Sequence, residues 1–112
     1  MIITETEIVA RFMRLEAPVL ERWVAAGWLR PQASQTGFLF DEADVARAHL
    51  LCDLAFDMEL GEEALAVVLP LVDRLNGTRT MLHALSAAVQ SQPQDIRDAI
   101  LAEMRVFLEA AS

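Results

Sequence analysis

The sequence has one cysteine, four glycines that lie far apart, no lysine and no long apolar run. A single cysteine, Cys52, excludes an internal disulfide framework and suits a reducing compartment. The separated glycines exclude a glycine-rich phosphate-binding loop. No segment reaches the roughly 18 apolar residues of a membrane helix, and residues 1–7 lack the pattern of a signal peptide. We therefore expect a soluble cytoplasmic domain that spans no membrane.

Positive charge is also scarce. The 112 residues carry 17 acidic and 9 basic side chains, which gives a formal net charge of −8. Nucleic-acid-binding proteins gather positive charge on one face to contact phosphates, so this balance argues against a nucleic-acid partner. Residues 41–65 hold eight of the acidic residues and a single arginine, Arg47. This stretch is either a solvated helical face or a docking surface for a basic partner.

Two helices are predicted at the N-terminus. Thr4 and Glu7 match a capping box, in which a hydroxyl and a carboxylate satisfy the first free amides, and predict a helix over residues 5–14. Proline in the first turn predicts a second helix from Ala17, and Gly27 is expected to end it in a left-handed conformation.

A small hairpin and a third helix are expected next. The apolar segments 28–31 and 37–40 predict two strands around the polar loop 32–36. Asp41 is expected to cap the third helix, which carries an apolar side and a polar stripe that includes residues 49, 53 and 57.

The C-terminal half predicts further helices. A fourth helix is expected from Gly61, with a bend at Pro70 and an end at Asn76–Gly77, and a new helix is expected to run to about Val89. A second capping-box pattern over residues 91–94 predicts a final amphipathic helix.

These elements predict a mainly α fold of two parts. Residues 1–60 have the order helix, helix, hairpin, helix, which is that of a winged helix-turn-helix domain with a small β-hairpin wing. Residues 61–112 form the expected C-terminal helical region.

Residues that could carry chemistry are few. His49 and Cys52 lie three apart on a helix, but His83 is the only other histidine and no second cysteine exists, so a four-ligand zinc site is not expected. Cys52 falls on an apolar helix face, where a thiol stays protonated and inert. The sequence therefore predicts neither an enzyme nor a bound cofactor or metal.

Three segments resemble MerR-type domains. These segments are residues 2–10 (IITETEIVA), residues 20–31 (LERWVAAGWLRP) and residues 38–45 (FLFDEADV). The resemblance departs where DNA contact would be made. Glu21 precedes Arg22 and Trp23 in the second helix, and the wing strand carries Phe38 and Leu39 in place of the Tyr-Arg pair common in the family. Phosphates would repel an acidic recognition helix.

A related domain without DNA-binding residues is that of the CbpM-type chaperone modulators. Residues 32–44, a glutamine-containing loop followed by an aromatic strand and an acidic cap, are similar to theirs, and so are residues 65–75 (LAVVLPLVDRL). The resemblance implies binding to the J-domain of a DnaJ-like or CbpA-like co-chaperone and inhibition of its action on Hsp70. A MerR-type regulator that binds DNA as a dimer stays the alternative, and an isolated oligomerisation module is a third possibility.

The predicted docking site is the acidic third helix and the turn after it. Asp53, Asp57, Glu59 and His49 are the candidate partner-binding residues, because the spacing of the two aspartates puts both on one helix face and few arginines lie near them in the sequence. The competing interpretation is that these acids only keep the protein soluble. If the site lies elsewhere, we expect it around Glu16 and Glu21.

A homodimer is expected through the C-terminal helices. Apolar residues keep a 3-4 spacing from Leu65 to Val89, and the segment from Ile96 to Leu108 is amphipathic. The alternative is an intramolecular helical hairpin that hides both faces.

Overall fold

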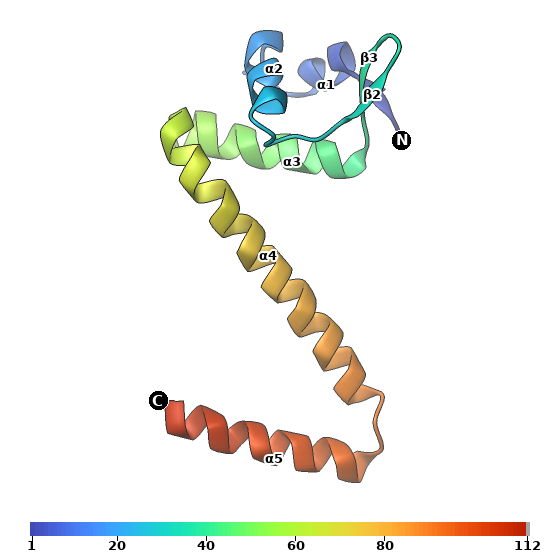
Figure 1. Cartoon of the computed structure of the whole chain (residues 1–112), viewed down its shortest axis with the longest axis vertical. Helices are drawn as coiled ribbons and strands as arrows, with labels where there is room; N and C mark the ends of the chain where they lie inside the picture. Colours follow the sequence, from blue (N-terminus) through green and yellow to red (C-terminus); the bar gives the residue numbers. More distant parts are fainter. Residues whose placement is uncertain (112) are drawn as a thin grey trace. The chain divides into compact units, whose positions relative to one another are not determined.

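The computed structural model describes residues 1–111 and is mainly helical, with a small antiparallel sheet and two C-terminal helices (Figure 1). The chain divides into two compact units, Met1–Leu69 and the part from Pro70 onward. All buried side chains among the described residues belong to the first unit.

The first unit begins with strand β1 (Ile3–Thr4) and helix α1 (Glu5–Arg11). The predicted capping box is confirmed. The amide of Glu7 donates to the hydroxyl oxygen of Thr4 at 3.3 Å, and the amide of Thr4 donates to the carboxylate of Glu7 at 3.2 Å. Helix α1 is shorter than predicted, because Phe12 is already extended.

Helix α2 (Ala17–Ala25) begins where Pro18 predicts it. The predicted left-handed stop is also confirmed, since Gly27 has a φ of 79°. The chain after α2 folds back on the helix, and the amides of Trp28 and Leu29 both donate to the carbonyl of Trp23. Leu29 is buried by this turn.

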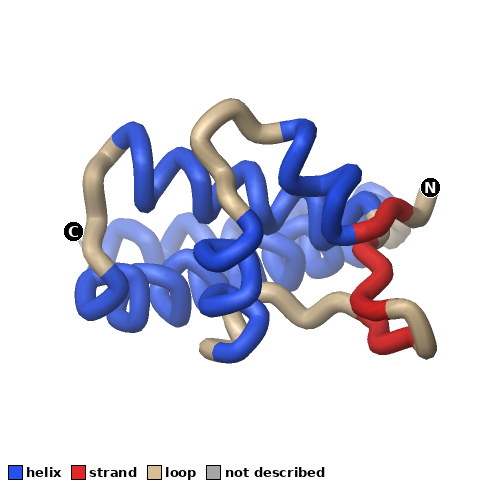
Figure 2. Tube along the Cα trace, turned by 90° about the horizontal axis from the view of Figure 1, so that it is seen from above, coloured by secondary structure: helices blue, strands red, loops and turns tan. Residues whose placement is uncertain are grey.

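The sheet differs from the predicted hairpin. Its strands follow the order β1-β3-β2, where β2 is Gln32–Ser34 and β3 is Gly37–Phe40, and both pairings are antiparallel (Figure 2). The strand predicted at 28–31 is wrong, because the apolar side chains there fill the turn after α2 and the core. The pairing strand lies in the segment predicted as a loop, and β1 is a third strand that the pattern did not indicate.

Helix α3 (Glu42–Cys52) lies beneath α1 and α2 in Figure 1. Asp41 caps it as predicted, in a reciprocal box with Asp44. The amide of Asp44 that donates to the Asp41 carboxylate is the main cause that lowers the pKa of Asp41. Helix α3 continues without a break into the π-helical turn η1 (Asp53–Asp57).

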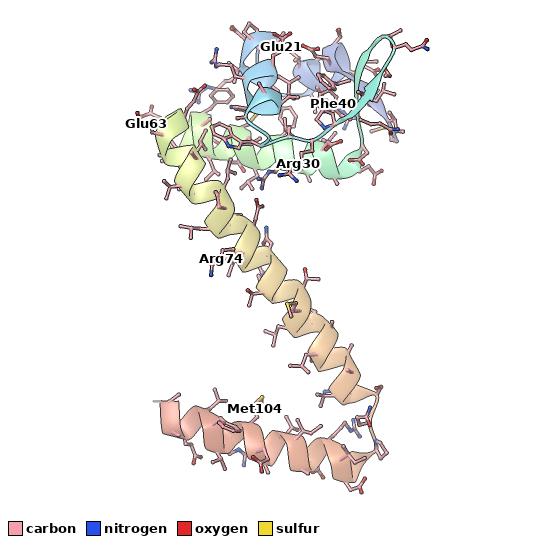
Figure 3. All side chains as sticks on the ribbon, in the orientation of Figure 1. Glu21, Arg30, Phe40, Glu63, Arg74 and Met104 are labelled. Carbon is pink, nitrogen blue, oxygen red and sulfur yellow. The ribbon has the colours of Figure 1, made fainter. Side chains whose placement is uncertain are left out.

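One core holds the first unit together. Trp23 of α2 packs near Phe56 of η1, with ring centroids 6.0 Å apart. Figure 3 shows Phe40 of β3 turned inward. The residues of α3 and η1 that are buried in this core are Ala48, Leu51 and Leu54. Val45, Cys52, Ala55 and Phe56 are partly buried and pack against it.

Helix α4 (Glu62–Gln90) is longer than predicted. Its first two turns belong to the first unit, because Leu65 and Leu69 are buried in the core. The predicted end at Asn76–Gly77 is wrong, and the helix also passes through Pro70. Helical glycine costs only about 1 kcal/mol relative to alanine, which flanking helical turns outweigh.

The last helix is α5 (Gln94–Ala111). The second capping box is not formed as predicted. The hydroxyl of Ser91 donates to the carbonyl of Ala88 at 2.7 Å, and thereby satisfies the end of α4 rather than the start of α5.

Gly77 and Gly27 predict opposite effects of alanine. Gly77 lies within α4, and a Cβ atom added there would meet open space. Gly77→Ala is therefore expected to raise the free energy of unfolding of α4 by about 0.5–1 kcal/mol.

Gly27→Ala is expected to lower the free energy of unfolding of the first unit by about 1–2 kcal/mol, because a side chain is crowded in the left-handed conformation that Gly27 adopts. Urea unfolding followed by circular dichroism at 222 nm measures both. Destabilisation by Gly77→Ala would mean that α4 ends there.

Candidate functional site

The four predicted docking residues follow one another along α3, η1 and the turn after them. His49 lies in α3, Asp53 and Asp57 begin and end η1, and Glu59 lies two residues further on. His49, Asp57 and Glu59 are exposed, and Asp53 is about half-exposed. We call these four residues the acidic stripe.

His49 connects the acidic stripe to helix α1. Its Nδ1 lies 3.3 Å from Oδ2 of Asp53, one helical turn away. Its ring meets the ring of Phe12 edge-on, with centroids 6.1 Å apart and an interplanar angle of 61°. His49 is thus held between a carboxylate and an aromatic ring at the surface.

Asp57 has a cationic neighbour that the sequence analysis did not anticipate. Arg14, which follows α1, places Nη1 3.8 Å from Oδ1 of Asp57 and donates from the same nitrogen to the carbonyl of Phe56 at 3.1 Å. The guanidinium also lies over the Phe56 ring, 5.1 Å from its centroid. The sequence analysis expected few arginines near the aspartates, and tertiary packing brings one, Arg14, to Asp57 from 43 residues away in the sequence.

Glu59 has an unusual backbone conformation. Its φ of 57° is the only positive value at a described residue other than glycine. The amide of Leu60 donates to the carbonyl of Leu54 at 3.0 Å, a bond that closes the end of the π-helical turn. A left-handed residue with a side chain costs on the order of 1–2 kcal/mol, and such strain concentrates at functional sites.

Apolar side chains border the acidic stripe. Met13 is fully exposed at the end of α1, and Met58 is 63% exposed in the turn after η1. Met13 also lines a shallow groove of about 140 Å³, whose other lining residues are Phe12, Arg14, Cys52, Phe56 and Asp57. Flexible methionines adapt to the shape of a partner surface. We call Met13 and Met58 the methionine pair.

The methionine pair and Arg14 were missed because no local pattern identifies them. Met13 and Arg14 follow α1 in a short turn, and only the tertiary contacts of this turn with η1 bring Arg14 beside the acidic stripe. A π-helical turn is itself frequent at functional sites, but its sequence signal is weak.

Cys52 lies in the floor of the same groove and is half-buried. Burial of the thiol, together with the nearby carboxylates of Asp53 and Asp57, raises its pKa to about 11. A raised pKa agrees with the expectation of a protonated thiol.

The raised pKa predicts slow alkylation. At pH 8 a thiol with a pKa near 11 is about one-thousandth ionised, so iodoacetamide is expected to modify native Cys52 at least a hundredfold more slowly than the chain in denaturant. The rate should increase steadily up to pH 10. Mass spectrometry of quenched samples measures it, and rapid labelling at pH 8 would contradict an inert thiol.

The alternative docking site that the sequence analysis named, around Glu16 and Glu21, lies on another part of the first unit. Figure 3 shows Glu21 on the outer side of α2. Burial raises the pKa of Glu5, and a hydrogen bond to the Glu21 carboxyl and repulsion from it act in the same direction. Two carboxyl groups that share a site in this way are poorly suited to approach DNA phosphates.

Within residues 1–111, no three His, Cys, Asp or Glu side chains lie together in a way that could hold a metal ion. None of the described helices has the length and hydrophobicity required to cross a membrane.

No family model, curated protein or solved structure matches this chain.

Proposed function

We propose that this protein binds the J-domain of a DnaJ-like or CbpA-like co-chaperone in the cytoplasm and prevents it from acting on Hsp70. The observation that carries the proposal is the acidic stripe beside the methionine pair. J-domains present a basic helix to Hsp70, so a protein that covers this helix competes directly with Hsp70. Inhibition of this kind is stoichiometric and needs no cofactor.

Charge supports the encounter with a basic helix. Residues of the first unit carry 12 acidic and 5 basic side chains, so nearly all of the excess negative charge lies there. Complementary potentials speed association and orient the partners more than they raise affinity. The pairs His49–Asp53 and Arg14–Asp57 are solvent-exposed and therefore contribute little to stability. A cationic partner can take the place of His49 and Arg14 beside the two aspartates at a small cost in free energy.

Affinity requires apolar contacts near the centre of the interface. Met13, Phe12 and Phe56 line the groove, and the exposed Met58 follows Asp57, another lining residue, in the sequence. The partner that fits this surface is therefore a helix with lysines or arginines on one face and an apolar residue between them.

We also propose that α1, α2 and the β2–β3 hairpin form a winged helix-turn-helix that has lost DNA binding. The order of the elements and the MerR-like segments support this assignment. Glu21, exposed on α2, would oppose phosphates where such domains contact DNA.

Adding increasing amounts of this protein to an Hsp70 ATPase assay stimulated by the J-domain protein tests the proposed function. The stimulated rate is expected to fall in proportion to added protein and to reach the basal rate near one equivalent of J-domain. The basal ATPase of Hsp70 alone is the control and should not change. An unchanged stimulated rate at a tenfold excess would contradict the proposal.

A mobility-shift experiment with duplex DNA distinguishes the proposed J-domain inhibitor from the alternative, a MerR-type regulator that binds DNA. At physiological salt we expect no complex, because net negative charge opposes the duplex. A salt-dependent complex at sub-micromolar protein would favour the regulator instead.

A further inference from the structure

A second groove lies on the first unit, and no residue of the acidic stripe lines it. Its volume is about 480 Å³, within the range of roughly 300–1,000 Å³ that is usual for binding pockets. The start of α1, the start of α2 and strand β3 form its walls, and α1 contacts both other elements (Figure 1). We call it the β3 groove.

The β3 groove is lined by both apolar and polar side chains. Val9, Ala17 and Leu39 contribute apolar surface, and Phe38, which is 39% exposed, adds an aromatic ring. Three threonines supply hydroxyl groups; they are Thr4, Thr6 and Thr36. A side chain with an apolar stem and a polar end matches a lining of this kind.

The β3 groove is also acidic. Glu5 is the one charged side chain among its described lining residues, and Glu16 directly precedes the lining residue Ala17. Burial raises the pKa of Glu5, and a hydrogen bond to the Glu21 carboxyl and repulsion from it act in the same direction, so the two carboxyl groups lie close together. A cation bound between two such carboxylates relieves their repulsion.

A partner cannot bind here by adding a strand to the sheet. Strand β3 lies between β1 and β2 and pairs antiparallel with both, so neither of its edges is open. Recognition at this groove therefore depends on the side chains of the partner. Arginine is the side chain that fits, because its guanidinium binds carboxylates through two parallel hydrogen bonds and its stem is apolar.

The exposure of the groove favours a segment of a protein over a free small molecule. Small-molecule sites enclose about 70–90% of the ligand surface, whereas Phe38 leaves one wall of the β3 groove open to solvent. An open aromatic wall offers contact to a residue beside the one that enters the groove.

We propose that the β3 groove binds an arginine side chain of a flexible segment of a partner protein. The guanidinium lies between the carboxyl groups of Glu5 and Glu21, and the stem covers Val9. The ring of Phe38 packs against an apolar residue next to the arginine. This binding is independent of the proposed contact between the acidic stripe and a J-domain.

An NMR titration of the ¹⁵N-labelled full chain tests the proposal. The probe is a blocked pentapeptide, alanine-leucine-arginine-leucine-alanine, at concentrations up to about 5 mM. The amide signals of residues 4–9 and 36–39 are expected to shift together and to give a Kd of about 1 mM or lower. Unchanged signals in these two segments, or shifts centred on Asp53 and Asp57, would overturn the proposal.

Two altered probes separate the contributions of charge and of the flanking residues. The same pentapeptide with citrulline in place of arginine keeps the shape but is neutral, so its affinity should be at least about tenfold lower. Blocked arginine alone should also bind at least about tenfold more weakly, because it lacks the leucines that meet Phe38. Equal affinity of the citrulline peptide would exclude recognition by the carboxylates, and equal affinity of blocked arginine would show a small-molecule site; either result overturns the proposal.

Glu5→Gln combined with Glu21→Gln is the corresponding variant of the protein. It keeps the shape of both side chains and removes their repulsion, so the fold should persist while the affinity for the arginine peptide falls at least about tenfold. Glu103→Gln with Glu109→Gln, which makes the same change of net charge on α5, is the matched control and should leave the affinity within about twofold of wild type. An equal loss in both variants would show unspecific attraction of charge and contradict a site in the β3 groove.

Discussion

Asp53→Arg combined with Asp57→Arg is expected to slow association with a J-domain by about tenfold to a hundredfold at low salt, because steering by opposite charge has this magnitude. The salt dependence of the association rate should become flatter, since fewer complementary charges remain to be screened. Stopped-flow fluorescence or surface plasmon resonance at several salt concentrations measures both effects. Inhibition of the stimulated Hsp70 ATPase should weaken in parallel.

Asp95→Arg with Asp98→Arg is the control for this experiment. It makes the same change of total charge on α5, outside the proposed J-domain docking site, and should affect association only slightly. Both double variants should keep the wild-type circular dichroism spectrum, because exposed substitutions shift stability by about 0.5 kcal/mol or less. Wild-type binding by the variant at Asp53 and Asp57 would move the contact to the region of Glu16 and Glu21.

Trp23→Ala is expected to have the largest effect on stability. Trp23 is only 2% exposed and packs beside Phe56. Removal of a buried tryptophan side chain costs about 3–5 kcal/mol, which is a large part of the roughly 5–15 kcal/mol that stabilises a domain. The urea midpoint of the first unit should fall by more than about 1 M, given a slope of about 1–3 kcal/mol per molar urea.

Trp28→Ala is the matched control, because Trp28 is the only other tryptophan and is half-buried. Its loss should cost clearly less than the loss of Trp23. Trp23→Ala should also weaken J-domain binding. Phe56 lines the groove and lies beneath the Arg14 guanidinium, and this substitution removes the ring that Phe56 packs against. Equal destabilisation by the two variants would contradict the assignment of Trp23 to the centre of the core.

Several features that depend on neighbours three or four residues away could be predicted from the sequence, although the capping box over residues 91–94 did not form. The capping box at Thr4, the cap at Asp41 and the left-handed Gly27 all follow from such local chemistry. The candidate docking residues could be named for the same reason, because helical spacing alone aligns Asp53 with Asp57.

Packing in the folded chain determines which groups those residues contact. The apolar residues 28–31 suggested a strand, but the core took up Leu29 and moved the pairing to residues 32–34. Arg14 reaches Asp57 because the turn after α1 lies against η1, and α4 continues through Gly77 because the turns on either side outweigh one glycine. Contacts across tens of residues depend on how apolar faces share one core, and no short window of sequence contains that information.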